Sequence, residues 1–480
     1  MKSIFRSWGF LKVILWAVTL IVLFYVEEDW RGARAWAATK AAWEAKGESL
    51  DPAKFVPPPI PDDENLAALP IFKVEPDPKE NGARVPLKLR QALDEETHGG
   101  DLPRIKATPD ELRVGLAKAY ARAFPGATPP ADMLAQFDAL YPVIPEIRAA
   151  ARARPSCRFN LDYDVQPPMF RSFNLLTGQI RLSQRLCLHA VIAMEDNQAE
   201  VALDDIRLNL RLAAAAGRDP TLVAGLVDIG ITAINSEAVE DGLARHAWND
   251  AQLADLQGEL GGIDFLAQYR FTLRGELITE SIPNLDYVKI LRGTRNPISM
   301  GNLWPVGWTD LTKLKVIDLI LPELKSIDPQ SCRVYPEVTR QIERDTEQAE
   351  ALPGRLAPWN LMVGISAPVF TNLAMKFAVT QVWRIDEARI ACGLERYRLA
   401  HAAYPASLDA LVPASIDELP HDIMNGEPYH FRLQADGTYL LYSVGWNQTD
   451  DGGKVVYKTD APRQVDYLQG DWVWSAEKNF

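Results

Sequence analysis

Oxygen-bearing side chains gather in a loop near the C-terminus, where Asn447, Asp450 and Asp451 stand among glycines and Asp471 follows. Calcium takes about six to eight hard oxygens, mostly from carboxylates and carbonyls, on a loop that glycine allows to curl. The sequence therefore predicts a calcium site formed by Asn447, Asp450, Asp451 and Asp471. The alternative is an Asx-rich turn that ends a strand with no ion.

A second acidic group lies in the middle of the chain. Alternation of apolar and polar residues in the segment FNLDYDV predicts a short strand with Asp162 and Asp164 on one face. Two such carboxyl groups can share a proton or hold a metal, and with His189, Glu195 and Asp196 they would serve an envelope hydrolase. The alternative is that these acids are the wet face of the strand and that His189 is a satisfied core histidine.

Standard catalytic signatures are missing from the sequence, which contains no HExxH, GxSxG or GxxxxGK motif. The net charge of −13 argues against a nucleic-acid partner, because binding phosphates needs a basic surface. The four cysteines are too few for a disulfide scaffold. Outside the cytoplasm Cys157 and Cys332 would either pair or stay as buried thiols. A structural or binding protein is therefore expected rather than an enzyme.

An apolar run at residues 13–26 predicts a membrane anchor, long enough to cross a bilayer if it is counted from Trp8. The flanking charges change sign across the run, from Lys2, Arg6 and Lys12 to Glu27, Glu28 and Asp29. The positive-inside rule then predicts one pass, with the N-terminus in the cytoplasm and the bulk outside. In a bacterium this means the inner membrane and the periplasm. A cleaved signal peptide is the competing interpretation, but the bulky residues that end the run do not suit cleavage.

Trp30, Trp36 and Trp43 follow the anchor at a spacing that places them near one face of a helix. We expect this helix to pack on its own domain, with only Trp30 close enough to the bilayer to be an interfacial residue. A proline-rich segment around residues 55–61 comes next and predicts an extended strap.

The segment from residue 389 to residue 474 predicts a helix that ends at His401, a break at Tyr404, and a hairpin. The hairpin strands are PYHFRL and TYLLYSV, which are joined by a turn that contains Gly437. This segment resembles the globular head of the major pseudopilin of type II secretion systems. The matching residues are Glu395 to Leu399, Tyr404, Pro405, Leu408, Leu411, Leu419, Pro420, Asp422, Gly426, Pro428, Tyr429 and Ser443 to Gly453.

The resemblance implies a small α+β module and a calcium-binding loop that is completed by an aspartate before the closing aromatic segment, here Asp471. The chain lacks the N-terminal pseudopilin signature beside its anchor, so we do not expect it to polymerise. The rest of the chain resembles an uncharacterised membrane-anchored bacterial family.

Between the anchor and this module the periodicity predicts helices. Thr108 opens a capping box, Asn249 or Asp250 starts another helix, and residues 180–275 suggest stacked antiparallel helices. Residues 281–310, rich in Pro, Gly, Asn and Trp, suggest loops. We predict a mainly α protein with a C-terminal α+β pseudopilin-like module and a transmembrane helix. Its predicted segments are residues 1–29 (tip and anchor), 30–85 (juxtamembrane helix and strap), 86–367 (helical domain) and 368–480 (long helix and hairpin module).

The expected function is that of a membrane-anchored structural or binding protein of the cell envelope. It would contact a partner protein or another copy of itself, and calcium would stiffen the C-terminal module. The alternative is the envelope hydrolase that uses Asp162 and Asp164.

Overall fold

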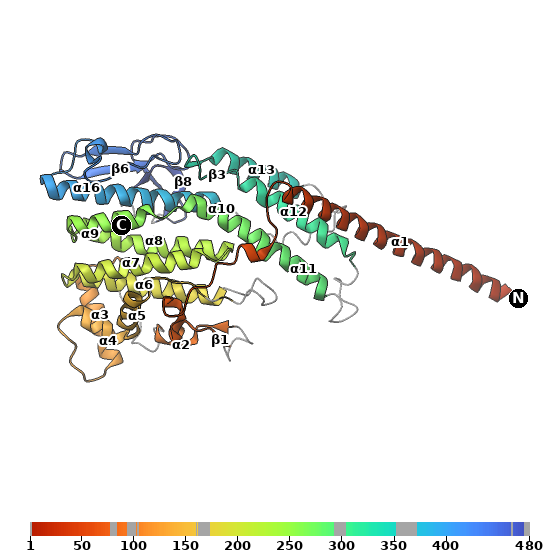
Figure 1. The fold of residues 1–480 in the computed structure, drawn as a ribbon, viewed down its shortest axis with the longest axis horizontal. Coiled ribbons are helices and arrows are strands. Elements are labelled where there is room, and N and C mark those ends of the chain that lie inside the picture. Colours follow the sequence, from red (N-terminus) through yellow and green to blue (C-terminus); the bar gives the residue numbers. More distant parts are fainter. Residues whose placement is uncertain are drawn as a thin grey trace.

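The computed structural model describes residues 2–76, 84–93, 102, 105–159, 161, 173–291, 304–351, 372–461 and 464–474. They form a mostly helical protein with small antiparallel sheets. One long helix projects from the body, and the C-terminal strands lie along one side of the helical stack (Figure 1). The expected mainly helical class with an N-terminal apolar helix is confirmed, and the pseudopilin-like character of the module stays a prediction.

The projecting helix is α1 (Lys2–Glu44), which continues without a break for 43 residues. Its most apolar stretch is 0% buried, as a helix that crosses a membrane would be in the absence of lipid. Farther along, Trp36 and Trp43 pack against the core, whereas Trp30 is 55% exposed. The expected packing of Trp36 and Trp43 is therefore confirmed, and the interfacial position of Trp30 stays a prediction.

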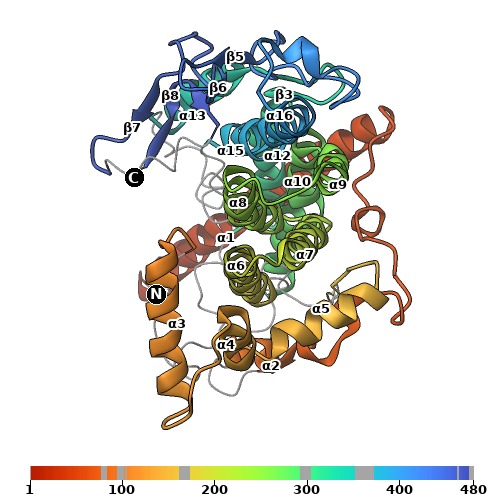
Figure 2. The ribbon, with the colours of Figure 1, turned by 90° about the vertical axis from the view of Figure 1, so that its left-hand side faces the viewer.

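Stacked antiparallel helices form the centre of the body, as predicted (Figure 2). Local caps set their starts: Thr221 accepts the N–H of Ala224, and Asn249 forms a capping box with Gln252. These helices are α6 (Phe173–Glu195), α7 (Ala199–Gly217), α8 (Leu222–Ala244), α9 (Asp250–Gly261) and α10 (Phe265–Gly275).

Helix α8 is also long and apolar enough to cross a membrane, but its most apolar window is 61% buried. It packs closely against α6 and α7. Burial on this scale is typical of the core helix of a globular body.

Shorter helices cover the outer side of α6 and α7 (Figure 2). The predicted capping box at Thr108 is confirmed: its side chain accepts the N–H of Glu111, and Glu111 accepts the N–H of Thr108. This group consists of α2 (Leu87–Ala92), α3 (Pro109–Ala123), α4 (Met133–Leu140) and α5 (Val143–Ala153).

The end of the body nearest the anchor is helical too. It contains the π-helical turn η5 (Glu276–Ser281), α11 (Ile282–Leu291), α12 (Gly307–Glu323) and α13 (Pro336–Ala351). The expectation of loops over residues 281–310 is therefore wrong for residues 281–291 and for the start of α12, while residues 292–303 lie outside the described residues. Pro283 follows η5 by one residue in a helix that continues from α10, so it leaves one carbonyl of the preceding turn without a helical N–H.

The last helical segment is continuous through three parts: α15 (Leu373–Val379), the π-helical turn η8 (Thr380–Asp386) and α16 (Glu387–His401). The helix that was expected to end at His401 is confirmed. Short 3₁₀ turns lie elsewhere at η1 (Pro52–Lys54), η2 (Leu66–Ala68), η3 (Pro70–Phe72) and η9 (Leu408–Leu411).

The predicted hairpin is confirmed as β5 (His430–Leu433) and β6 (Tyr439–Ser443), which pair with His430 opposite Tyr442. Strand β9 (Trp472–Val473) adds to β6, so the sheet order is β5-β6-β9. Three further antiparallel pairs are β1 (Glu75–Pro76) with β2 (Arg84–Val85), β3 (Ile327–Asp328) with β4 (Arg333–Val334), and β7 (Val455–Tyr457) with β8 (Val465–Gly470).

One hydrophobic cluster extends from Leu66 to Trp472, so the helical stack and the C-terminal module share a core. The predicted strand around Asp162 and Asp164 lies mostly outside the described residues. Cys157 and Cys332 are both unpaired, with Cys157 buried and Cys332 exposed.

Candidate functional site

The predicted calcium loop follows β6 and returns to the module at Asp471, between β8 and β9. Asp471 is 1% exposed, and its carboxylate accepts the backbone N–H groups of Asp451, Gly453 and Lys454 at 2.7 to 3.2 Å. Burial raises the pKa of Asp471 despite these donors. The Asp471 carboxylate therefore closes the loop as a negatively charged hydrogen-bond acceptor.

The other predicted ligands, Asn447, Asp450 and Asp451, also form hydrogen bonds within the protein. Asp450 accepts the Tyr442 hydroxyl at 3.0 Å and the N–H of Gly452 at 2.9 Å, and this backbone bond lowers its pKa. The Asn447 amide donates to Asp451 at 3.0 Å. Within the described ranges, no three His, Cys, Asp or Glu side chains are grouped so that they could hold a metal. The calcium site formed by Asn447, Asp450, Asp451 and Asp471 therefore stays a prediction.

In the second predicted group, the described acids Glu195 and Asp196 bind different partners. Glu195 pairs with Arg245, while Asp196 accepts the N–H of Leu134. Burial and the neighbouring carboxyl of Asp132 raise the pKa of Asp196 to about 6. Asp162 and Asp164, which carried the hydrolase interpretation, lie outside the described residues.

His189 lies in a buried ionic network that joins α4, α5, α6 and α7. Its Nδ1 is 2.5 Å from Asp205 Oδ2, and its Nε2 is 3.1 Å from Asp138 Oδ1. Arg148 Nε forms an ion pair with the other oxygen of Asp205 at 2.7 Å. Burial alone would lower the pKa of His189, but Asp205 and Asp138 outweigh it and raise the pKa to about 9.

His189 therefore matches the alternative to a catalytic role, a core histidine whose two ring nitrogens both have hydrogen-bond partners. The network contains an imidazolium between two carboxylates, and each ring nitrogen is bound to a structural partner. With His189 and Asp205 both fully buried, the group is suited to tying helices together.

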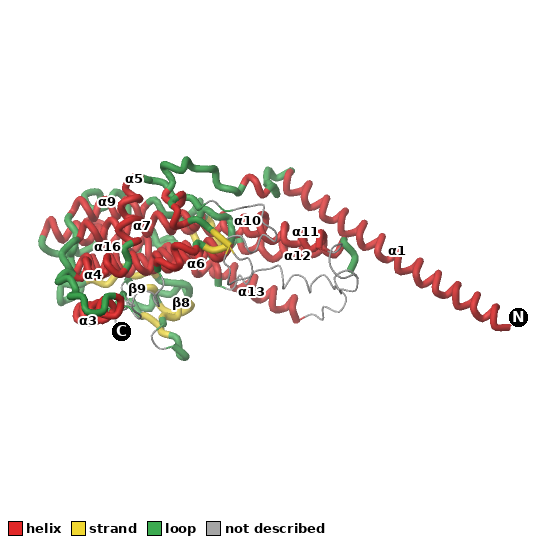
Figure 3. Tube along the Cα trace, turned by 90° about the horizontal axis from the view of Figure 1, so that it is seen from below, coloured by secondary structure: helices red, strands yellow, loops and turns green. Residues whose placement is uncertain are grey.

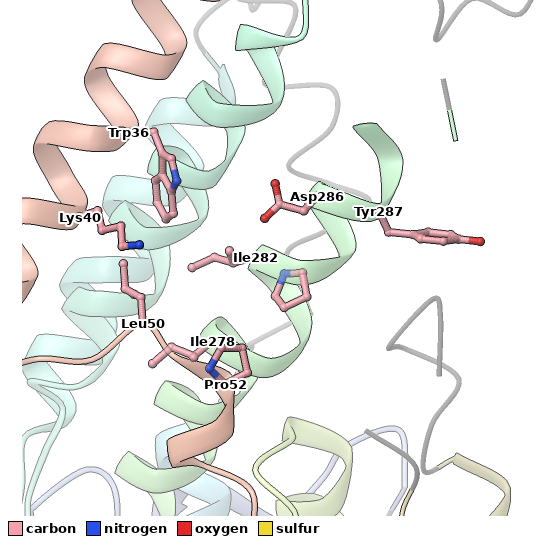
Figure 4. Close-up of a pocket in the computed structure, with 9 residues that line it drawn as sticks. Trp36, Lys40, Leu50, Pro52, Ile278, Ile282, Asp286 and Tyr287 are labelled. Carbon is pink, nitrogen blue, oxygen red and sulfur yellow. The ribbon is translucent and has the colours of Figure 1, made fainter. Parts of the chain in front are cut away.

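A cavity of about 420 Å³ opens between the root of α1 and α11 (Figure 4). Its walls are mostly apolar, and Lys40 and Asp286 supply polar groups. The lining residues are Trp36, Lys40, Leu50, Pro52, Ile278, Ile282, Pro283, Asp286 and Tyr287.

Lys313 supports this cavity from α12. Its ammonium bonds Asp286 at 2.6 Å and Asp310 at 3.2 Å, and it lies 4.8 Å from the ring of Trp36. The arrangement suits an apolar group with a polar end.

Directly after its apolar stretch, α1 is joined to the start of α12. Asp29 accepts the N–H of Gly307 at 2.8 Å, and Glu28 accepts the indole N–H of Trp308 at 2.8 Å. A Cβ added at Gly32 would collide with the backbone of Gly307. We call these contacts the α1–α12 seam; α12 lies beside the root of α1 in Figure 3.

Sequence reasoning missed a buried acidic group on the last helix, Asp386 and Glu387, which are 4% and 0% exposed. A signal was available, because two adjacent acids stand among apolar residues and two arginines in the helical segment VWRIDEARIAC.

Comparisons with known proteins returned no match: no family model, no curated protein and no solved structure is similar to this chain.

Proposed function

We propose that this chain is a single-pass membrane protein with a structural or binding role in the cell envelope. The α1–α12 seam supports this proposal most directly. Removal of the apolar stretch as a signal peptide beyond Glu28 would also remove a buried part of the fold, since Glu28 is 8% exposed and bonded to Trp308. The anchor is therefore retained in the proposal.

The proposed orientation places the N-terminus in the cytoplasm and the helical body in the periplasm, following the change of charge across the anchor. Glu28 and Asp29 have a double role in this scheme. They mark the outer end of the bilayer, and Asp29 meets the N-terminal end of α12, where a negative charge is favourable. The body would then meet another envelope protein or a second copy of itself.

The test uses the full chain with alkaline phosphatase fused to its C-terminus, an enzyme that is active only outside the cytoplasm. We expect active phosphatase, a membrane pellet that resists carbonate, and an N-terminal sequence that begins before residue 8. A soluble product that begins after residue 26 would overturn the proposal.

A matched pair of variants separates anchoring from folding. Val18→Lys with Leu20→Lys places two charges in the anchor, each unfavourable by about 3 kcal/mol in a bilayer, and should release the protein from the membrane. Val114→Lys with Val223→Lys makes the same change at two exposed positions of the body and should leave the protein in the pellet.

A further inference from the structure

The C-terminal module rests on η8 and the start of α16. Trp383 of η8 is 1% exposed and forms a cluster with Tyr442, Val465 and Val473 of the module. A π-helical turn is rare and occurs often at functional positions. Here it places Asp386 and Glu387 at the contact between the helical stack and the module. We call this contact the module joint.

Acidic groups meet at the module joint from both sides. The helix contributes Asp386, which accepts the Tyr429 hydroxyl at 3.0 Å and the Gln381 amide at 2.9 Å. The module contributes Asp422, which is 0% exposed and accepts the N–H groups of Met424 and Val444 at 3.0 and 3.1 Å.

Glu387 is the least compensated of these groups. It is 0% exposed, and neither carboxyl oxygen has a hydrogen-bond partner of good geometry among the described residues. Burial, and then Asp422, Asp386 and Glu240, raise its pKa well above the usual range, while the N–H of Ser443 opposes them. A buried carboxyl without a counter-charge keeps its proton.

The surrounding cations do not neutralise Glu387. On η8, Arg384 forms an ion pair with Glu240 of α8 at 3.0 Å. Arg389 of α16 favours ionisation of Asp386, and His430 of β5 favours ionisation of Asp422. None of the described cations forms an ion pair with Glu387.

We propose that the module joint is a proton-controlled contact, which stays closed while its carboxyl groups are protonated and opens as rising pH ionises them. Each new charge enters a buried space beside another acid, so ionisation favours the open form. Opening would separate the module from η8 and would change the surface that the body presents in the envelope.

The sign of the pH dependence follows from proton binding. Burial raises the pKa of Asp386 from 3.8 to about 7, against the opposing effect of its two hydrogen bonds. A group whose pKa is raised in the closed form stabilises that form fully at pH values below its ordinary pKa. This contribution is lost as the pH rises through the raised pKa. The loss from Asp386 therefore falls between pH 3.8 and about 7, and that from Glu387 extends above it.

Hydrogen exchange of the full chain in nanodiscs tests the proposal, with correction for intrinsic exchange and at pH values from 5 to 6.5, below the range in which His189 gives up its proton. We expect protection of η8 and β6 to fall by about tenfold per pH unit for each proton released on opening, and both Asp386 and Glu387 release one in this range. Helix α7 should stay protected throughout. Unchanged protection of η8, or an equal loss in α7, would overturn the proposal.

Variants identify the groups that titrate. Glu387→Gln and Asp386→Asn keep the size of each side chain without the charge, so each should reduce the slope. Glu418→Gln, at an exposed position of the same module, should leave the slope as in the wild type. A full wild-type slope in the doubly substituted protein would overturn the proposal, and if that protein does not fold, the wild-type series decides alone.

Discussion

Buried carboxyl groups occur in two regions of this protein, the His189 network and the module joint. In the His189 network, Asp205 lies 2.5 Å from His189 and 2.7 Å from Arg148, so its negative charge faces two cations. In the module joint, Glu387 lies among other acids and has no hydrogen-bond partner of good geometry in the described part of the chain.

The difference shows that burial alone does not set the state of an acid. Both regions remove carboxyl groups from water, which raises the pKa of each. At Asp205 the cations His189 and Arg148 oppose this rise in pKa, whereas at Glu387 the neighbouring acids add to it. Ion pairs stabilise the His189 network. The module joint, as proposed, is stable only while its carboxyl groups are neutral.

The largest expected effect comes from removing the cation at the centre of the first region. His189→Ala leaves Asp205 and Asp138 without their shared partner, and breaking a buried pair in this way costs about 3–5 kcal/mol. Urea unfolding would measure the change. His401→Ala, at an exposed position, should change the free energy of unfolding by less than about 0.5 kcal/mol.

The same network has its own pH window. The folded pKa of His189, about 9, is above its ordinary value of 6.5, so its contribution is present below 6.5 and lost as pH rises through about 9. The wild type should lose more stability across this window than His189→Ala does. An equal loss in both would contradict an ionised network.

The second prediction applies one chemical change to both regions. Asp205→Asn removes an anion between two cations and should cost about 2–3 kcal/mol. Glu387→Gln removes no ion pair, so it should change stability by less than about 1 kcal/mol at pH 6 and raise it relative to the wild type at pH 9. An equal loss of stability in the two variants would contradict the proposed difference between the two regions.

An intermediate effect is expected in the C-terminal loop, where backbone donors replace both cations and protons. Asp471→Ala leaves three N–H groups without their acceptor and should cost about 1–3 kcal/mol. Asp451→Ala, at an exposed position, should cost less than about 0.5 kcal/mol.

A double variant of the same loop tests the calcium prediction. Because Asp471 is taken up by N–H groups, we expect millimolar calcium to change the Tm of the wild type by less than about 1 °C. A larger, concentration-dependent rise that is lost in the variant Asp450→Ala, Asp451→Ala would show that the loop rearranges around an ion.

Much of the fold could be predicted because its signals are local. The capping boxes at Thr108 and Asn249, the Gly437 hairpin and the apolar α1 each depend on residues within a few positions of one another. Helix α11 was missed because its proline and polar residues are typical of loops, while packing against η5 and α12 favours a helix.

The candidate sites were harder to predict for a related reason. His189 was singled out, but its partners Asp138 and Asp205 were not, since they are 51 and 16 residues away and come from other helices. Two of the acids that were expected to act with it have other partners. Glu195 pairs with Arg245, and Asp196 contacts Asp132 and the N–H of Leu134.

The sequence by itself determined the apolar N-terminal helix, most of the other helices, the hairpin and the positions of the acids, because hydrophobic period, caps and turn residues act over short distances. Only the tertiary structure decided which acids are buried and what faces each of them. Those outcomes depend on contacts such as Arg384 with Glu240, 144 residues apart, whose strength is set by distance and burial and not by spacing along the chain.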